Sequence, residues 1–240
     1  GGAGEIGMNL NLYGFRSGKS TQWIIADFGI TFADPSTPEI DIILPDPKFI
    51  AERKESLLAI ILTHAHEDHM GAIQYLWPAL KCPIYATPFT ATIIKKKVSE
   101  YSWANECIIN AVPIDSSIEL GPFSLELISL THSIPESSAI ALHTPNGTLL
   151  HTGDWKFDHN PVVGKPPNLK RLKTLGDNGV LALIGDSTNV FSSGTSGSEG
   201  DLYQPLAKII EQCPHRVAVT CFASNISRLK TLTRIGRETG

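Results

Sequence analysis

Residues 62–71 read LTHAHEDHMG, and this stretch decides the fold. Three histidines, a glutamate and an aspartate fall between positions 64 and 69. The preceding run, LLAIILT at 57–63, is apolar and of strand length, which predicts a strand buried on both faces. GAIQYLWPAL at 71–80 predicts a helix that Pro78 shortens. The polar loop therefore lies between a strand and a helix, where an α/β sheet presents functional groups at the carboxyl ends of its strands.

The spacing of this loop, His64-x-His66-x-Asp68-His69, differs from the i, i+4 pair of a helical HExxH site. Side chains two apart in a short loop can converge on one ion, and Asp68 and His69 are displaced enough to serve a neighbouring ion. Histidine and aspartate suit zinc or manganese, and two-ion hydrolytic sites place their ions roughly 3.5–4 Å apart. The alternative is a solvated helix-start loop with Asp68 as a cap. Four such groups at this spacing favour the metal site.

A two-ion site needs further ligands, and two other strand ends offer them. SLTHSIPES at 129–137 ends an apolar strand in His132, and LLHTGDWKFD at 149–158 ends one in Asp154. A lone histidine at a strand end is more often a hydrogen-bonded structural group, but His132 repeats the strand-Thr-His form of the first site. Asp154 could bridge two ions because a carboxylate has two oxygens, and Gly153 allows close backbone approach.

Several other features have weaker claims to function. His143 and His151 fall within hairpin strands, where packing or surface exposure is the better interpretation. The run Lys95–Lys97 fits a solvated helix end better than an RNA contact. The glycines of GGAGEIG at 1–7 precede a strand instead of following one, so a tight turn is favoured over a nucleotide-binding loop.

The pattern of predicted secondary structure changes near residue 190. Before it, strands are predicted over 8–15 and 21–29, as a hairpin around SGKS, over 83–87, 107–112 and 123–130, over 137–144 and 148–154, as a hairpin across the turn PNG, and over 181–187. Helices are predicted to start at Pro88 and over 168–176. FSSGTSGSEG at 191–200 is a flexible Gly/Ser-rich stretch, followed by a predicted helix (201–213), strand (216–222) and helix (224–238). We therefore expect one domain over 1–190. We expect a linker and the first part of a second domain over 191–240, which is too short for a core of its own.

The bulk composition bounds the class of protein. The chain has 240 residues, 42% of them hydrophobic and 18% charged, which is ordinary soluble composition. Its formal charge of −4 does not indicate a uniformly basic nucleic-acid binder, although a local basic channel stays open. No apolar run approaches the roughly 20 residues of a membrane span. No signal peptide is visible, but the chain starts at Gly1, so targeting stays open. Four cysteines without CxxC spacing indicate reduced core residues of a cytosolic protein.

The HxHxDH loop, His132 and Asp154, each at a strand end, resemble the metallo-β-lactamase fold. Asp27 in IIADFG matches the aspartate that ends an early strand in that fold and supports its metal site. The resemblance is closer still to the ribonuclease J family of β-CASP nucleases. Seven segments match its motifs in order: GGAGEIGMN (1–9), LPDPKFI (44–50), THAHEDHMGAI (63–73), THSIPES (131–137), TGDWKFD (152–158), GDSTN (185–189) and CFASNISRL (221–229).

The resemblance implies an α/β fold, an αββα sandwich interrupted by an inserted β-CASP domain. GDSTN lies just before that insertion, and Asp186, which matches the acidic residue of the first β-CASP motif, would support the metal site. The family's chain later returns to the first domain with one more metal-binding histidine and a phosphate-binding loop. We therefore expect this sequence to be an amino-terminal fragment with an incomplete sandwich, little or no activity of its own and a weakly held second ion.

Carried over to this sequence, the resemblance assigns ligands and roles. His64, His66 and His132 would hold one ion, Asp68 and His69 the second, and Asp154 would bridge the two. Asp68 and Asp154 would be catalytic, with two zinc ions or manganese as cofactor. The implied activity is hydrolysis of single-stranded RNA from a 5′-monophosphate end, and also internally, in a cleft between the domains. A cytoplasmic homodimer or tetramer is implied for the full-length protein.

Two other interpretations compete with a ribonuclease, the second of them from a different functional class. A small-molecule hydrolase of the same fold, such as a thioesterase of the glyoxalase II type, is disfavoured by the β-CASP-like segment after residue 190. A non-catalytic RNA-binding or scaffolding subunit with a degenerate site is disfavoured because all six candidate ligands are intact.

Overall fold

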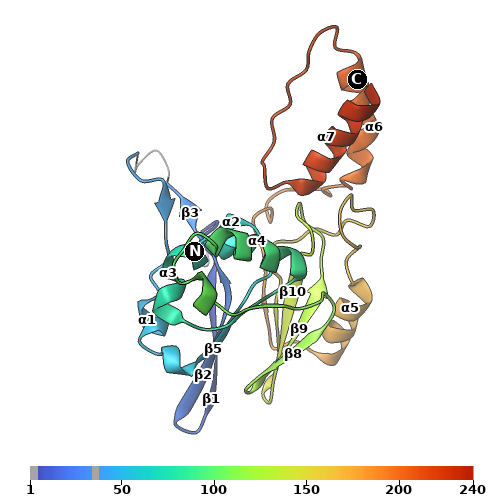
Figure 1. The fold of residues 1–240 in the computed structure, drawn as a ribbon. Helices are drawn as coiled ribbons and strands as arrows, with labels where there is room; N and C mark the ends of the chain where they lie inside the picture. The colour runs from blue at the N-terminus through green and yellow to red at the C-terminus, as the bar shows by residue number, and fades with distance from the viewer. Residues whose placement is uncertain (1–4, 34–37, 240) are drawn as a thin grey trace.

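The computed structural model describes residues 5–33 and 38–239, and its body consists of two facing β-sheets flanked by helices (Figure 1). The turn predicted for GGAGEIG includes residues 1–4, which lie outside the described ranges. In the part of the chain that is described, no helix is both long and apolar enough to cross a membrane.

The first sheet carries the strand that precedes the histidine loop. Its order is β1 (Leu10–Ser17), β2 (Ser20–Phe28), β5 (Leu57–Ile61), β6 (Ile84–Ala86) and β7 (Ile109–Ala111). The β1–β2 hairpin is antiparallel and the other pairs are parallel, so the predicted hairpin around SGKS is confirmed. In β5 four of the five residues are buried, as the apolar run predicts.

The second sheet is mostly antiparallel. Its order is β12 (Ala182–Ile184), β11 (Gly147–His151), β10 (Ser138–Thr144), β9 (Phe123–Ser129) and β8 (Ser117–Leu120). Thr144 pairs with Gly147 across the two-residue turn in PNG, which confirms the second predicted hairpin. A separate short ribbon pairs β3 (Thr31–Phe32) with β4 (Ile42–Ile43).

The helices before residue 190 lie on the outer faces of the sheets, and the two after residue 202 extend away from them (Figure 1). The helices are α1 (Lys48–Ala51), α2 (Glu67–Met70), α3 (Ile73–Leu80), α4 (Pro88–Val98), α5 (Leu169–Asn178), α6 (Tyr203–Glu211) and α7 (Ile226–Thr239), with 3-10 turns η1 (Lys54–Ser56), η2 (Ala104–Glu106) and η3 (Gly200–Leu202). The predicted helix over 71–80 is α3, which continues two residues past Pro78.

Three apolar clusters define the layers. Residues such as Ile24 and Ile61 of the first sheet pack against Leu125 and Leu142 of the second. The other face of the first sheet packs on α3 and α4, and the other face of the second packs on α5. This αββα order confirms the predicted fold class, and burial of aliphatic side chains between the layers stabilises it.

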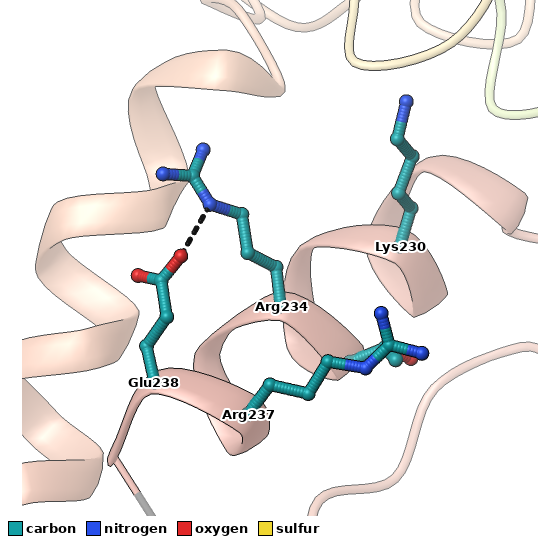
Figure 2. Close-up of a pocket in the computed structure, with 5 residues that line it drawn as sticks. Lys230, Arg234, Arg237 and Glu238 are labelled. Atoms are coloured by element: carbon teal, nitrogen blue, oxygen red, sulfur yellow. Dashed lines mark hydrogen bonds and ion pairs between the residues drawn. The ribbon is translucent and has the colours of Figure 1, made fainter.

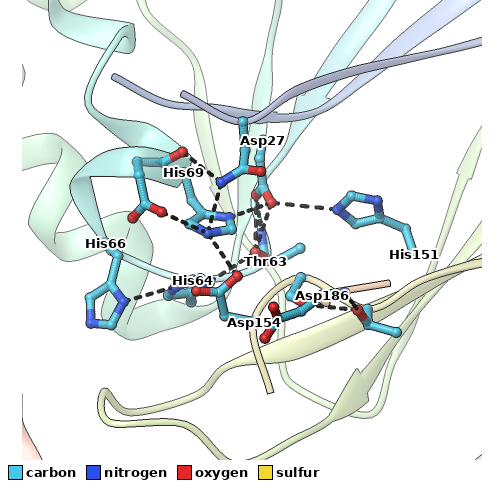
Figure 3. A network of polar contacts seen from close by, with 12 residues as sticks. Asp27, Thr63, His64, His66, His69, His151, Asp154 and Asp186 are labelled. Carbon is cyan, nitrogen blue, oxygen red and sulfur yellow. Dashed lines mark hydrogen bonds and ion pairs between the residues drawn. The ribbon is translucent and has the colours of Figure 1, made fainter. Parts of the chain in front are cut away.

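The topology brings several strand ends to one edge of the sandwich. β2 and β5 are parallel, as are β11 and β12, and β9 and β11 are both antiparallel to β10. The carboxyl ends of β2 and β5 in one sheet and of β9, β11 and β12 in the other lie at the same edge (Figure 3). Each strand end, or the segment after it, contributes a polar residue to the site below.

The region after residue 190 differs in part from the expectation. The predicted strand over 216–222 is wrong, because these residues form no strand and are exposed. A strand needs a neighbour to satisfy its backbone N–H and C=O groups, and among the described residues none pairs with this segment. It belongs instead to the long connection between α6 and α7, which lie side by side and extend away from the sheets (Figure 1).

Two smaller expectations also change. The strand predicted over 107–112 is reduced to β7, because η2 and its exit occupy the preceding residues. Cys82 and Cys107 are buried as expected, but Cys213 and Cys221 are exposed. The domain division at residue 190 stays a prediction.

Candidate metal centre

Three imidazoles converge at the edge where the strands end. His64 Nε2 lies 3.0 Å from His66 Nδ1, and His132 Nε2 lies 3.1 Å from the same nitrogen. His64 and His66 come from the loop after β5, and His132 comes from the loop after β9. One ligand atom from each lies within 4.8 Å of the others, a spacing that could hold a metal ion.

The surroundings keep these three imidazoles uncharged. Burial lowers the pKa of His132 to about 4, with the nearby His66 charge acting in the same direction. Burial lowers the pKa of His64 well below its usual range, and the charges of His69, His66 and His132 reinforce the shift. The pKa of His66 is also lowered, chiefly by burial. Neutral imidazole is the form that ligates a metal, so the donor set suits a cation.

A second group of donors adjoins the first. His69 Nε2 lies 3.2 Å from Asp154 Oδ1 and 3.5 Å from Asp68 Oδ2. His64, His69 and Asp154 also have ligand atoms within 4.8 Å of one another. Of the predicted second set, His69 lies in this group and Asp68 lies beside it, while His64 is within reach of both groups.

Asp154 faces both groups with different oxygens. Its Oδ1 faces His69, and its Oδ2 lies 3.8 Å from His132 Nε2. Figure 3 shows its carboxylate between the histidine loop and the strands of the second sheet. The preceding Gly153 has φ +57°, and a Cβ at that position would lie 2.8 Å from the Thr63 side chain. Glycine is needed there for the backbone to bring Asp154 close to the loop after β5.

The carboxylate of Asp27 organises the site from beneath. It is fully buried at the end of β2 and accepts hydrogen bonds from Thr63 N at 2.8 Å and Thr63 Oγ1 at 2.9 Å. His69 Nδ1 lies 2.7 Å from its Oδ2. The Nε2 atom of His69 faces Asp154 and Asp68, as Figure 3 shows for Asp154. When Nδ1 donates its hydrogen to Asp27, the lone pair of Nε2 is free to bind an ion.

The charges around His69 are matched to a cation. Burial alone would lower the pKa of His69, but the Asp27 charge and the hydrogen bonds that the ring donates to the carboxylates of Asp154, Asp27 and Asp68 raise it well above its usual range. For Asp27, burial is outweighed by the charge and hydrogen bonds of His69 and His151, and its pKa is lowered. The carboxylates around His69 thus favour positive charge at this position, which either a proton on the ring or a metal ion at Nε2 supplies.

Asp186, predicted as a supporting residue, also lies at this edge. It follows β12, its N–H donates to Thr152 Oγ1 at 3.1 Å, and its charge raises the pKa of His132 slightly against the effect of burial. Asp186 is therefore close enough to act on the metal centre through space.

Three contributors to the site were missed from the sequence. His151 is buried in β11 with Nε2 3.5 Å from Asp27 Oδ2, and its Nδ1 lies 2.9 Å from Tyr13 Oη. Asn9 donates from its backbone and its Nδ2 to the carbonyl of Asp68. The packing interpretation of His151 was therefore incomplete. Its strand position gave no local signal; only the packing of the second sheet, which contains β11, against the first sheet brings it to Asp27.

Comparison with known proteins identifies the class. A sequence profile of the Metallo-beta-lactamase superfamily matches residues 19–193. Since the match covers most of the chain, the chain belongs to the metallo-β-lactamase superfamily. A solved protein of unknown function from Enterococcus faecalis V583 has the same fold, with a TM-score of 0.65 and 19% identity over 97% of this chain and 60% of that one.

The curated relatives that this chain resembles include several ribonucleases J. Ribonuclease J of Sinorhizobium meliloti is 45% identical over all of this chain and 43% of its own length. Ribonuclease J of Helicobacter pylori (strain J99) is 38% identical over 98% of this chain and 34% of its own. Ribonuclease J of Thermus thermophilus is 35% identical over 97% and 41%. The chain is thus a homologue of ribonuclease J, as its motifs predict, and spans less than half the length of these relatives.

Proposed function

We propose that this chain carries the metal-binding half of the active site of a ribonuclease that hydrolyses RNA phosphodiesters. The observation that supports the proposal best is the Asp154 carboxylate, whose two oxygens face two adjoining donor groups at 3.2 and 3.8 Å. A two-ion hydrolytic site needs such a bridging position. The homology to ribonuclease J supports RNA as the substrate.

In this proposal His64, His66 and His132 hold one ion, Asp68 and His69 hold the second, and Asp154 contacts both. Imidazole and carboxylate donors suit zinc, with manganese as the alternative. When bound, such ions lower the pKa of an attacking water and neutralise charge on the phosphate oxygens.

The chain's own groups have separable tasks. Asp27 fixes the ring of His69 through Nδ1, so that Nε2 keeps its direction. Asp68 is one-third exposed beside His69, where its free oxygen can orient a water molecule and accept its proton. Attack at phosphorus would leave a 5′-phosphate on one product and a 3′-hydroxyl on the other.

The wider assignments follow the same homology. We propose single-stranded RNA as the partner, degraded from a 5′-monophosphate end and also cut internally, in a cytoplasmic enzyme. We also propose that residues 1–190 belong to the metallo-β-lactamase domain and 191–240 to the start of a β-CASP domain, with RNA between them. The homodimer or tetramer stays a prediction.

The test uses a natural full-length protein that contains this chain. It is incubated with 5′-monophosphorylated single-stranded RNA and, separately, with a thioester, with and without a chelator. We expect RNA cleavage that the chelator abolishes and that Asp68→Ala reduces at least about a hundredfold. Asp177→Ala, at an exposed carboxylate on α5, is the matched control and should retain activity. Thioester turnover without RNA turnover, or full cleavage by Asp68→Ala, would overturn the proposal.

A further inference from the structure

A second buried polar network lies beside the metal centre and has no part in the steps above. Its charged members are Asp158, Glu199, Arg228 and Lys156, whose Nζ lies 3.5 Å from Asp158 Oδ2, and Asp158 and Glu199 are only 2% and 8% exposed. They are far apart in the sequence and come from the loop after Asp154, the end of the Gly/Ser-rich segment and the first turn of α7. Buried carboxylates are costly unless they are paired and hydrogen-bonded, so their presence here needs a reason.

Asp158 fastens the end of the Gly/Ser-rich segment to the first domain. Its Oδ1 accepts from Ser198 Oγ at 2.7 Å and from Asn160 N at 2.9 Å, and its Oδ2 accepts from Glu199 N at 2.9 Å. These bonds fix the backbone at 198–199, although the residues just before it are exposed. The exposed segment therefore ends at a fixed point next to the metal-centre loops.

Glu199 then holds α7. Its Oε1 lies 2.6 Å from Arg228 Nε, and its Oε2 lies 3.3 Å from Arg228 Nη2. Paired contacts of this kind between guanidinium and carboxylate fix orientation as well as distance. Asn225 Oδ1 accepts from Arg228 N at 2.9 Å, so the same residue is held at both its backbone and its side chain.

The start of α7 touches the metal centre directly. Ser227 N donates to the carbonyl of Ser133 at 3.2 Å, and Ser133 follows the ligand His132 in the chain. Ser133 Oγ lies 3.4 Å from His66 Nε2, and the backbone of Ser224 is within hydrogen-bonding reach of His66. A displacement of this turn would therefore change the surroundings of His66 and His132, two of the three histidines of the first donor group.

The network also reaches His132 from its other side. Asp158 N donates to Thr131 Oγ1 at 3.0 Å, and Thr131 precedes His132. Thr131 and Lys156 form an isolated antiparallel bridge at the same place. The residues before and after His132 are thus both attached to this network.

We propose that Asp158, Glu199 and Arg228 are positioning residues that set the geometry of the His66–His132 pair by holding the start of α7 against it. The inference rests on the proposed metal centre, and it does not depend on RNA as the substrate. If so, the segment after residue 197 influences the geometry of the metal centre through α7. This influence is separate from any contact that the segment makes with substrate.

The experiment compares Arg228→Lys with Arg234→Lys in the 240-residue chain. Both residues lie on α7 and pair with a glutamate, but Arg234 is 65% exposed and pairs with Glu238 on an outer pocket (Figure 2). Two readouts are the imidazole nitrogen resonances of His66 and His132 in the metal-free chain, and the affinity for Co²⁺ with its visible absorption spectrum. Thermal unfolding is measured alongside, and Glu199→Gln serves as the second variant if Arg228→Lys does not fold.

We expect Arg228→Lys to shift the nitrogen resonances of both histidines, to weaken Co²⁺ binding about tenfold or more and to change the Co²⁺ spectrum. Arg234→Lys should match the wild type in all three. Lower thermal stability with unchanged resonances and unchanged Co²⁺ binding would show a merely structural network and overturn the inference. If the wild-type chain binds no Co²⁺, the proposed function fails, whereas the resonances of the metal-free chain still decide the role of Arg228.

Discussion

His69 Nδ1 lies 2.7 Å from Asp27 Oδ2, and both side chains are almost completely buried. This pair joins the end of β2 to the loop after β5, and it turns the other nitrogen of His69 toward Asp154 and Asp68. In the proposed centre the Asp27 carboxylate therefore does not bind the metal ion. It fixes the orientation of His69, which does.

Asp27→Asn tests this relationship. The amide keeps the size of the side chain but loses the charge that faces His69 and one acceptor oxygen, so Thr63 and His69 can no longer both be satisfied. We expect a loss of about 1–3 kcal/mol in the free energy of unfolding and about 10–100-fold weaker binding of the ion held by His69. Urea unfolding and zinc titration measure both. Asp177→Asn, at an exposed site, should change neither, and an unchanged zinc affinity in Asp27→Asn would remove Asp27 from the site.

Gly29→Ala tests the close approach of β2 to the histidine loop. A Cβ at this position would lie 1.7 Å from the carbonyl oxygen of Asp68, and backbone cannot move aside as a flexible side chain can. We expect a loss of about 3 kcal/mol or more, or a chain that does not fold. Gly176→Ala in α5 is the control, because a Cβ there meets nothing within 4 Å, and it should stabilise the chain by about 0.5–1 kcal/mol. Equal thermal stability of the two variants would contradict the packing described.

The pair of Glu126 and Arg171 predicts a pH dependence. Hydrogen bonds from Arg171 hold the pKa of Glu126 below its usual 4.5, aided by the charge of Arg171 and opposed by burial. Since folding favours the ionised form, this contribution is fully present above the unfolded-state pKa. It is lost as the pH falls through the lower folded-state pKa.

Glu126→Gln should therefore be less stable than the wild type by about 1 kcal/mol at pH 7, and this difference should shrink as the pH falls from about 5 toward 3. Unfolding by urea across this pH range measures it. The exposed pair of Glu106 and Lys81 provides the control, since Glu106→Gln should give a smaller difference. If the stability difference between Glu126→Gln and the wild type instead grew as the pH fell, the predicted sign of the pH dependence would be wrong.

Tyr13→Phe tests the contact between Tyr13 and His151, two residues whose place at the site was not predicted from the sequence. It removes the hydroxyl that lies 2.9 Å from His151 Nδ1, inside a region where His151 also faces Asp27. We expect a loss of about 1–2 kcal/mol, because a buried ring nitrogen is left without its partner. Tyr75→Phe, at a residue 42% exposed on α3, should be neutral. Equal unfolding midpoints for the two variants would show that the Tyr13 hydroxyl contributes nothing.

The sequence predicted those parts of the site that depend on local order. The spacing of His64, His66, Asp68 and His69 and the apolar strand before them are adjacent in the chain, so they could be recognised together. The hairpin of β10 and β11 in the second sheet was predicted from the PNG turn, which specifies a hairpin without distant information.

Long-range relationships were not predictable in the same way. His151 reaches Asp27 only because β11 packs opposite the first sheet, and no pattern within GTLLH indicates that contact. The segment 216–222 has the residues of a strand, but its strand propensity had no neighbouring strand among the described residues to pair with. The network of Asp158, Glu199 and Arg228 also joins positions whose distance in sequence conceals their contact.

An anomalous difference map from crystals of this chain grown with Zn²⁺ tests the proposed metal centre most directly. We expect the strongest peak about 2.0–2.1 Å from nitrogens of His64, His66 and His132. A second and weaker peak should lie between His69 and Asp154. A map at saturating zinc with no peak at these residues, or with peaks only elsewhere, would contradict the account.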